Sequence, residues 1–279
     1  MRKPEHRLAN GRRGLRYPSD LSDAEWVLVA PLIPPARRGG RRRSINERED
    51  LNAIFYVLAT GCQWQALPKD LPPKSTAHFY FQLWDWDGTL DRIHEAFYVA
   101  VREAAGREAS PNDAIIDSQS AKAAQKGLIG CSSGLRCGKK VTGRERHILV
   151  DTLGLLLGVS VLPANIQDRD GARDLLQRAR RRFPFIERIF ADAGYQGPKM
   201  AKVAAATGSW HLEIVKRSDL HRFVVLPKRW IVKRTFAWIS RNRRVMRDFE
   251  CYDTTVAAFV RLAMIRLMLK RLTKPSLCS

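Results

Sequence analysis

Two aspartates are the residues of this chain whose type and position best suit chemistry. Asp117 ends the apolar run in NDAIIDSQS, and Asp192 ends the apolar run in ERIFADAGYQG. A single aspartate at a strand end is usually a cap or turn residue, but neighbouring strand ends can bring two carboxylates together. Carboxylates and phosphate oxygens are the ligands that Mg²⁺ prefers. Two such ions stabilise the attacking and leaving oxygens of a phosphodiester displacement.

Two aspartates seldom suffice for such a site, and a carboxylate from a neighbouring helix would complete it. The periodicity of LPKRWIVKRTFAWISRNRRVMRDFE, residues 226–250, predicts one long helix. At ~100° per residue, one face is apolar and the other is basic, which suits either solvent or a polyanion. The apolar face comprises Ile231, Val232, Thr235, Trp238, Ile239, Val245, Met246 and Phe249. The basic face comprises Lys233, Arg234, Ala237, Ser240, Arg241, Arg244 and Arg247.

The elements that position the aspartates are predicted from residue 107 to residue 279. Apolar runs predict strands at NDAIIDSQS, at 146–152 and at LLLGVSVLPA, the last two joined by a turn at Gly154. A helix, DRDGARDLLQRARRRFP, then precedes the strand that ends at Asp192. A helix at KMAKVAAAT, a strand at WHLEIVKR, the helix of 226–250 and an amphipathic terminal helix follow. This order predicts a ribonuclease-H-like α/β domain.

The chain before this domain predicts an all-helical region over residues 19–106. Ser22 and Glu25 have the spacing of a capping box, and Gly61 closes a second helix. Ser75 or Thr76 should cap a third helix, and a fourth should end at Gly106. Helices joined by short turns and flanked by basic loops suit a helix-turn-helix-like DNA-binding region or a generic helical bundle. Residues 1–18 read as a basic flexible arm.

The composition and net charge limit the kinds of partner that the chain is expected to bind. The 279 residues fit two domains, and 49 Lys and Arg against 28 Asp and Glu give a net charge of +21. This excess points first to DNA or RNA, with a membrane surface as the rival. We expect no membrane association, since no apolar run approaches ~20 residues. The N-terminus has no apolar signal region, so we expect a cytoplasmic protein.

The chain resembles bacterial insertion-sequence transposases of the DDE class, of the insertion-sequence-five type, from about Leu21 to Leu272. The matching stretches are GCQWQALPKDLPPKST, IIDSQS, GKKVTGRERHILVDTLGLLL, QDRDGA, FADAGYQG, LEIVKRSD and LPKRWIVKRTFAWISRNRR. The resemblance implies a helical region that helps to bind terminal inverted repeats. It also implies a ribonuclease-H-like domain that cuts and joins double-stranded DNA with Mg²⁺ or Mn²⁺. Because two DNA ends must meet, it implies a homodimer or a higher assembly on DNA.

Carried over to this sequence, the first two catalytic acids and metal ligands are Asp117 and Asp192. The third acid is the Glu of a V-E-R-T-F-A-W motif, and here Lys233 replaces it. The resemblance also marks a basic residue shortly after this position as a phosphate contact, for which Arg241 is the candidate. A basic loop between the first two strands could hold phosphates or be solvated. The predicted DNA-binding residues are Lys139, Lys140, Arg144, Arg146, Arg234, Arg241, Arg244 and Arg247.

Lys233 puts catalysis by this copy in question. An ammonium ~4 Å from a divalent ion is repelled by roughly 8 kcal/mol at an effective dielectric near 20. Protonated lysine also offers no lone pair to a metal. Either metals bind poorly, or the side chain turns away and pairs with Asp117 or Asp192. The hypotheses are a DDE transposase with impaired cleavage and an inactive DNA-binding relic or repressor. A helical end-binding region before the catalytic fold disfavours a general nuclease.

Overall fold

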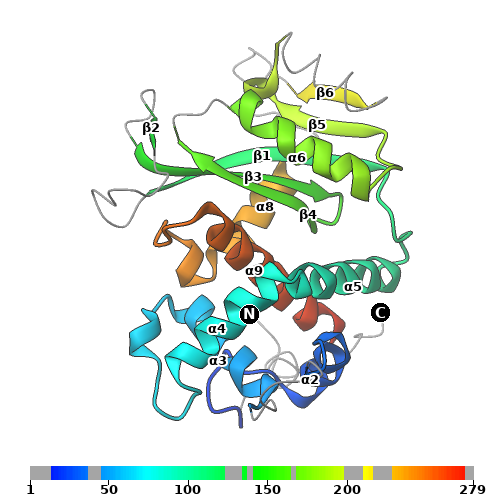
Figure 1. Cartoon of the computed structure of the whole chain (residues 1–279). Coiled ribbons are helices and arrows are strands. Elements are labelled where there is room, and N and C mark those ends of the chain that lie inside the picture. The colour runs from blue at the N-terminus through cyan, green and yellow to red at the C-terminus, as the bar shows by residue number, and fades with distance from the viewer. Residues whose placement is uncertain are drawn as a thin grey trace, which may run out of the picture.

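The protein is represented by a computed structural model, which describes residues 14–36, 45–122, 134–136, 141–164, 168–197, 210–215 and 228–273. Most of the predicted basic arm, the helix predicted at KMAKVAAAT, and the side chains of Lys139 and Lys140 lie outside these ranges. Figure 1 shows the sheet at one end of the molecule and the N-terminal helices at the other. Helices α8 (Arg229–Ser240) and α9 (Asp253–Leu272) lie between them.

The N-terminal region contains helices α2 (Asp23–Val29), α3 (Glu47–Thr60), α4 (Lys74–Trp86) and α5 (Thr89–Ala104). Short 3-10 turns, η1 (Ala30–Leu32) and η2 (Trp64–Ala66), follow α2 and α3. The capping box at Ser22 is present, since its side chain accepts a bond from Glu25 N and Glu25 accepts one from Ser22 N. Gly61 ends α3 at φ 70°. Helix α4 begins at Lys74 with Pro73 as its cap, before the predicted Ser75 or Thr76.

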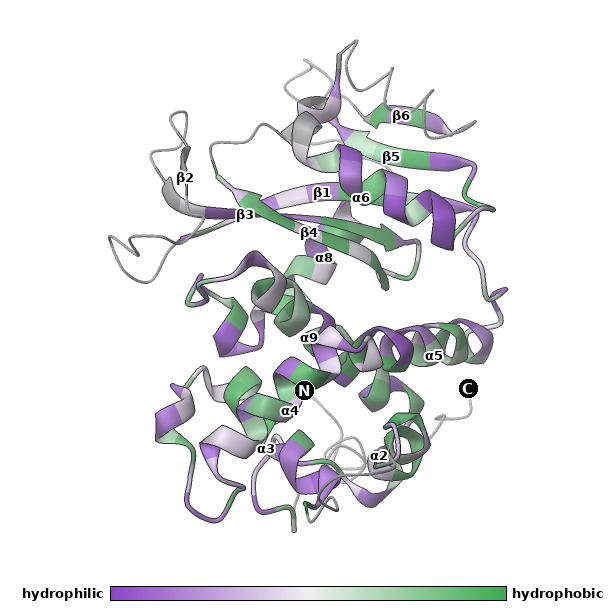
Figure 2. Ribbon diagram, viewed as in Figure 1, coloured by the Kyte–Doolittle hydropathy of each residue, from purple (hydrophilic) through white to green (hydrophobic). Residues whose placement is uncertain are grey.

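The sheet contains β1 (Asp113–Lys122), β2 (Gly134–Arg136), β3 (Val141–Asp151), β4 (Leu156–Pro163), β5 (Arg188–Asp192) and β6 (His211–Val215). The central strands run in the order β3-β1-β5-β6, and both β2 and β4 pair with β3. Pairing is antiparallel from β4 through β3 to β1 and parallel from β1 through β5 to β6. Helix α6 (Asp168–Arg182) packs on β3 and β4, and its hydrophilic and hydrophobic residues alternate in Figure 2.

The helix predicted over 226–250 is shorter than its periodicity suggested. Helix α8 ends at Ser240, Asn242 is extended, and a 3-10 turn, η4 (Arg243–Val245), follows. Ile231, Val232 and Ile239 are buried as predicted. Met246 and Phe249 are exposed, which corrects their predicted place on the apolar face, because the backbone turns before it reaches them.

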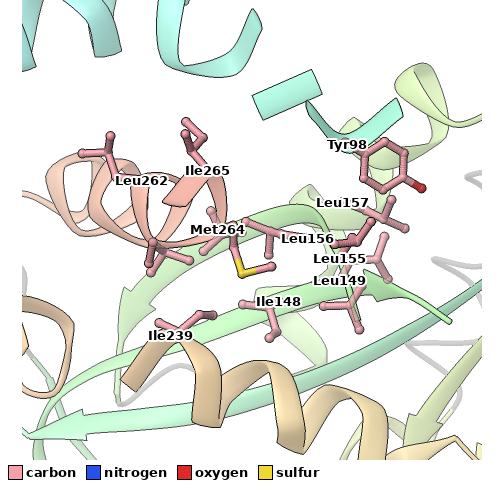
Figure 3. Close-up of a cluster of buried hydrophobic side chains, with 14 of the residues drawn as sticks. Tyr98, Ile148, Leu149, Leu155, Leu156, Leu157, Ile239, Leu262, Met264 and Ile265 are labelled. Carbon is pink, nitrogen blue, oxygen red and sulfur yellow. The ribbon is translucent and has the colours of Figure 1, made fainter. Parts of the chain in front are cut away.

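One hydrophobic core runs from the N-terminal helices into the sheet. Helix α9 packs against α5 and β4, so it lies among elements from both predicted regions. In Figure 3, Met264 of α9 lies near Ile148 of β3 and Ile239 of α8. Because this core is shared, a domain boundary near residue 107 stays a prediction. The helix-turn-helix character of the N-terminal helices also stays a prediction. No helix of the described residues is long and apolar enough to cross a membrane.

Candidate active site

The sheet brings Asp117 and Asp192 to one pocket. Strands β1 and β5 are parallel neighbours, and Ile115 is in register with Phe190. Each aspartate lies two residues further along its strand, so the alternation of side chains directs both toward the same face. The two carboxylates line a small pocket together with Arg229 of α8. Asp192 ends β5 as predicted, but Asp117 lies within β1, which continues to Lys122 because the residues after Asp117 pair with β3. Residues 75 positions apart in the sequence therefore meet because of strand pairing.

A lysine ammonium binds the first carboxylate. Asp117 is only 4% exposed, and its Oδ1 accepts a hydrogen bond from Ser118 N at 2.8 Å. Its Oδ2 lies 2.6 Å from Lys233 Nζ. The Lys233 side chain is half-exposed and reaches from α8 to this oxygen. Of the two arrangements considered for Lys233, the structure has the one in which the lysine pairs with Asp117.

A guanidinium binds the second carboxylate. Asp192 Oδ1 accepts a hydrogen bond from Gly194 N at 2.9 Å, and Oδ2 accepts one from Arg229 at 3.1 Å. Arg229 is not among the site residues predicted from the sequence. It precedes Lys233 by four residues, so both lie on the same face of α8. That spacing was the available signal for a second cation at the site.

The turn after Asp192 is held by a buried aromatic contact. The 3-10 turn η3 (Ala193–Tyr195) follows β5 directly, and Tyr195 is fully buried. Its hydroxyl lies 3.2 Å from Nδ1 of His147, a buried residue of β3. This contact fixes the backbone that donates to Asp192, so His147 has a structural role.

Contacts with the β3–β4 turn fix the position of α8. Thr235 Oγ1 donates to the Gly154 carbonyl at 2.8 Å, and Arg234 donates to the Leu153 carbonyl at 3.1 Å. Gly154 has φ 78°, and a Cβ there would lie 2.8 Å from Thr235 Oγ1, so glycine permits the close approach. The guanidinium of Arg234 stacks on the rings of Trp230 and Trp238, with centroid distances of 4.5 and 4.6 Å. Arg234 therefore takes part in packing.

The same turn is connected to the N-terminal helices. Asp151, which is fully buried, accepts hydrogen bonds from Leu153 N and Leu155 N at 2.9 and 2.8 Å. It also forms a buried ion pair with Arg102 of α5. Burial raises the pKa of Asp151, while the bonds from Leu155 and Arg102 act in the opposite direction. Helix α5, the turn and α8 thus form a continuous support for the residue that faces Asp117.

Several residues predicted to bind DNA have buried side chains. Arg144 and Arg146 lie on β3 and not in a loop, which corrects their predicted position, and both are at most 3% exposed. Arg144 pairs with Asp248, and Arg146 donates to carbonyls of Val245 and Arg247. Arg244 is also buried and pairs with Glu250 at 2.6 Å. Arg241 and Arg247, by contrast, are exposed.

The donor set does not fit a site for two divalent ions. Within the described ranges, no cluster of three or more His, Cys, Asp or Glu side chains could hold a metal. Asp117 and Asp192 are the two oxygen donors at the site, and each already contacts a cation. Lys233 adds positive charge where a third oxygen donor is needed.

Two carboxylates on adjacent parallel strands, in a mixed sheet of this order, are the arrangement predicted for a ribonuclease-H-like domain. Comparisons with known proteins specify the family. Residues 21–94 match a family described as transposases of the IS4/5 family, and residues 108–268 match the transposase DDE domain. The chain belongs to the insertion-sequence DDE transposases, a family with a ribonuclease-H-like fold that generally uses divalent metal ions.

Two relatives from Burkholderia cepacia are similar to parts of this chain. An uncharacterized 16.2 kDa protein of insertion element IS402 is 32% identical over 113 residues, which are 38% of this chain and 76% of the relative. A protein named as a transposase for insertion sequence element IS402 is 29% identical over 128 residues, which are 43% of this chain and 60% of that relative. The chain therefore matches less than two thirds of the second relative.

Proposed function

We propose that this chain binds the terminal inverted repeats of an insertion sequence as a DDE transposase whose metal-dependent cleavage and strand transfer are impaired. The contact of 2.6 Å between Lys233 Nζ and Asp117 Oδ2 carries this proposal. Asp117 and Asp192 remain the proposed metal ligands and catalytic acids. Lys233 occupies the place of the third acid and competes with a metal for the first.

The electrostatics of the pair support impairment. A divalent ion held by Asp117 would lie within several ångströms of the ammonium, at a cost of the order of 8 kcal/mol at an effective dielectric near 20. Arg229 adds a second cation at Asp192. A metal would have to displace Lys233 from a carboxylate that is almost fully buried. Lys233 is half-exposed, so its side chain can rotate away from Asp117 into solvent. The geometry therefore permits weak cleavage.

Charge and exposure support double-stranded DNA as the partner. We assign phosphate contacts to Arg241 and Arg247, which are exposed, and to Lys139 and Lys140 on sequence grounds. Arg144, Arg146, Arg234 and Arg244 support the fold beneath this surface. The N-terminal helices would read the repeats, and at least two copies would join the two ends in the bacterial nucleoid.

A second candidate function is repression or simple occupancy of the ends by an inactive transposase. The same Lys233–Asp117 pair favours it, since it affects catalysis and leaves the exposed arginines available. The two functions differ in whether the chain nicks a bound end.

The test uses duplex DNA carrying the terminal repeats of the element that encodes the chain, with one strand labelled, in Mg²⁺ or Mn²⁺. A metal contributes several kcal/mol to such chemistry, so we expect Lys233→Glu to increase cleavage by about 100-fold or more. Lys233→Gln removes the positive charge without adding a carboxylate for the metal, so cleavage should increase much less. Lys233→Glu combined with Asp117→Asn should remain inactive. Equal cleavage by the natural chain and Lys233→Glu would refute impairment, and no binding to the repeats would refute the function itself.

A further inference from the structure

Residues 241–252, between α8 and α9, form an exposed surface that combines arginines with large apolar side chains. Met246, Phe249 and Tyr252 are 59%, 40% and 68% exposed. Arg241, Arg243 and Arg247 of the same stretch are also exposed. We call this stretch the aromatic-arginine segment. In Figure 1 it lies at the left of the view, between the sheet and helices α3 and α4.

The backbone of the aromatic-arginine segment is held from beneath by two buried arginines of β3. Arg146 donates to the carbonyls of Val245 and Arg247. Arg144 donates to the carbonyls of Glu250 and Cys251 and pairs with Asp248 at 3.0 Å. A backbone fixed at four carbonyls loses little conformational entropy when its side chains bind a partner.

The phenylalanine ring has a rigid support. The Arg244 guanidinium lies 5.7 Å from the ring centroid of Phe249. Arg244 is itself fixed by Glu250 at 2.6 Å and by the Cys62 carbonyl at 3.0 Å. One side of the ring therefore rests on a fixed cation, and the ring is still 40% exposed.

The charges of the aromatic-arginine segment favour a polyanion over an acid-bearing or apolar protein surface. Its two acidic residues, Asp248 and Glu250, pair with Arg144 and Arg244 beneath the surface. The outward charge therefore comes from Arg241, Arg243 and Arg247. Arginines beside exposed aromatic rings are the combination that binds unpaired nucleotides, through phosphate contacts and base stacking.

The position relative to the two aspartates suits a DNA end. Asp248 N donates to the carbonyl of Lys122 at 2.9 Å, so the segment adjoins the end of β1. Lys122 follows Asp117 by five residues on that strand, which is about 17 Å at ~3.3 Å per residue. A DNA strand with one phosphate at Asp117 could place a base, a few nucleotides further along, on the aromatic-arginine segment.

We propose that Phe249 and Tyr252 stack on unpaired bases at a DNA end, while Arg241, Arg243 and Arg247 contact the adjoining phosphates. This inference rests on the proposed binding of DNA ends. It adds a site for single-stranded nucleotides beside the carboxylate pair. Because stacking uses the ring faces, the site accepts any base.

The test compares a blunt duplex with the same duplex carrying an overhang of four deoxyadenosines, one of them replaced by fluorescent 2-aminopurine. The natural chain should bind the overhang duplex more tightly and quench the fluorophore. Tyr252→Ala should lose about 10-fold of this preference, as expected for one lost stack. Tyr252→Phe, which keeps the ring, should retain it. Phe185→Ala removes an equally exposed phenylalanine before β5 and should have no effect.

Binding to the blunt duplex separates this inference from the proposed function. Equal losses on blunt and overhang DNA, or unchanged quenching in a variant with both Phe249→Ala and Tyr252→Ala, would overturn the stacking site while leaving end binding intact. A concentration-dependent dimer that Tyr252→Ala abolishes, with no change in quenching, would show that a second copy covers the surface and would also overturn it. Circular dichroism of each variant checks its folding.

Discussion

The first half of α8 and the aromatic-arginine segment that follows it are both rich in cations, but they use charge differently. Lys233 and Arg229 point inward and neutralise Asp117 and Asp192. Arg241 and Arg247 are exposed, and the acids near them are paired with buried arginines. The first arrangement blocks a site for cations, whereas the second leaves a surface for anions. Net charge alone does not distinguish these two uses.

The buried arginines connect the two regions. Arg144 lies on the sheet that carries Asp117, and it holds the aromatic-arginine segment by its carbonyls. Its charge is tolerated because Asp248 lies 3.0 Å away and the carbonyls of Glu250 and Cys251 accept hydrogen bonds from the same guanidinium. A change at Arg144 should therefore disturb the second region strongly.

The largest expected effect is on stability, for Arg144→Leu. Removing the guanidinium leaves Asp248 buried and unpaired, so the free energy of unfolding should fall by about 3–5 kcal/mol. Denaturant titration at pH 8 measures this loss. Burial already raises the pKa of Asp248 and Arg144 counteracts the rise, so without Arg144 the carboxylate should take up a proton more readily. The loss should consequently shrink at pH 5.

The matched control is Arg144→Leu combined with Asp248→Leu, which removes both charges. It should be more stable than Arg144→Leu alone, because no unpaired charge remains. If the single variant is as stable as the natural chain, Arg144 does not hold the segment in the way the structure indicates.

A smaller effect concerns His94 of α5, which is buried and stays neutral. Desolvation, followed by the charges of Arg261 and Arg182, lowers its pKa to about 3. Below pH 6.5 the unfolded chain binds a proton that the folded chain does not, so His94 reduces stability as pH falls toward 3. In this range His94 lowers the free energy of unfolding by about 1.4 kcal/mol for each pH unit. His94→Gln should flatten this part of the unfolding profile. An unchanged slope would mean that His94 is protonated in the fold.

The smallest effect is on the salt dependence of DNA binding. Each phosphate contact changes the slope of log K against log salt by about 0.9. Arg247→Ala should reduce the slope by that amount on a blunt duplex. Arg173→Ala, at an exposed position on α6, should leave it unchanged. Equal slopes for all three proteins would place the phosphate contacts elsewhere.

The sequence predicted the order of elements well, because that order depends on local patterns. The capping box at Ser22, the left-handed glycine after α3 and the run of strands around Asp117 all follow from residues close together in the chain. The meeting of Asp117 with Asp192 was predicted, but its premise was wrong for Asp117, which lies within β1 and not at its end.

The sequence did not predict where α8 ends or which arginines are buried. The apolar period continues through Val245 and Phe249, but hydrogen bonds to backbone carbonyls from Arg144 and Arg146, about 100 residues earlier, fix a non-helical backbone there. Charged residues in a basic stretch suggest a surface loop unless their distant partners are known. The role of Arg229 was not predicted for the same reason, since it depends on Asp192, 37 residues before it.

Metal titration of the natural chain and Lys233→Glu tests the central claim most directly, because it measures the site without DNA or chemistry. The observable is saturable Mn²⁺ binding, followed by electron paramagnetic resonance. We predict that Lys233→Glu binds Mn²⁺ at least about 100-fold more tightly than the natural chain, as expected when a repelling ammonium is replaced by a third carboxylate. Lys233→Gln should lie between them. Equal affinity of the natural chain and Lys233→Glu would contradict the account.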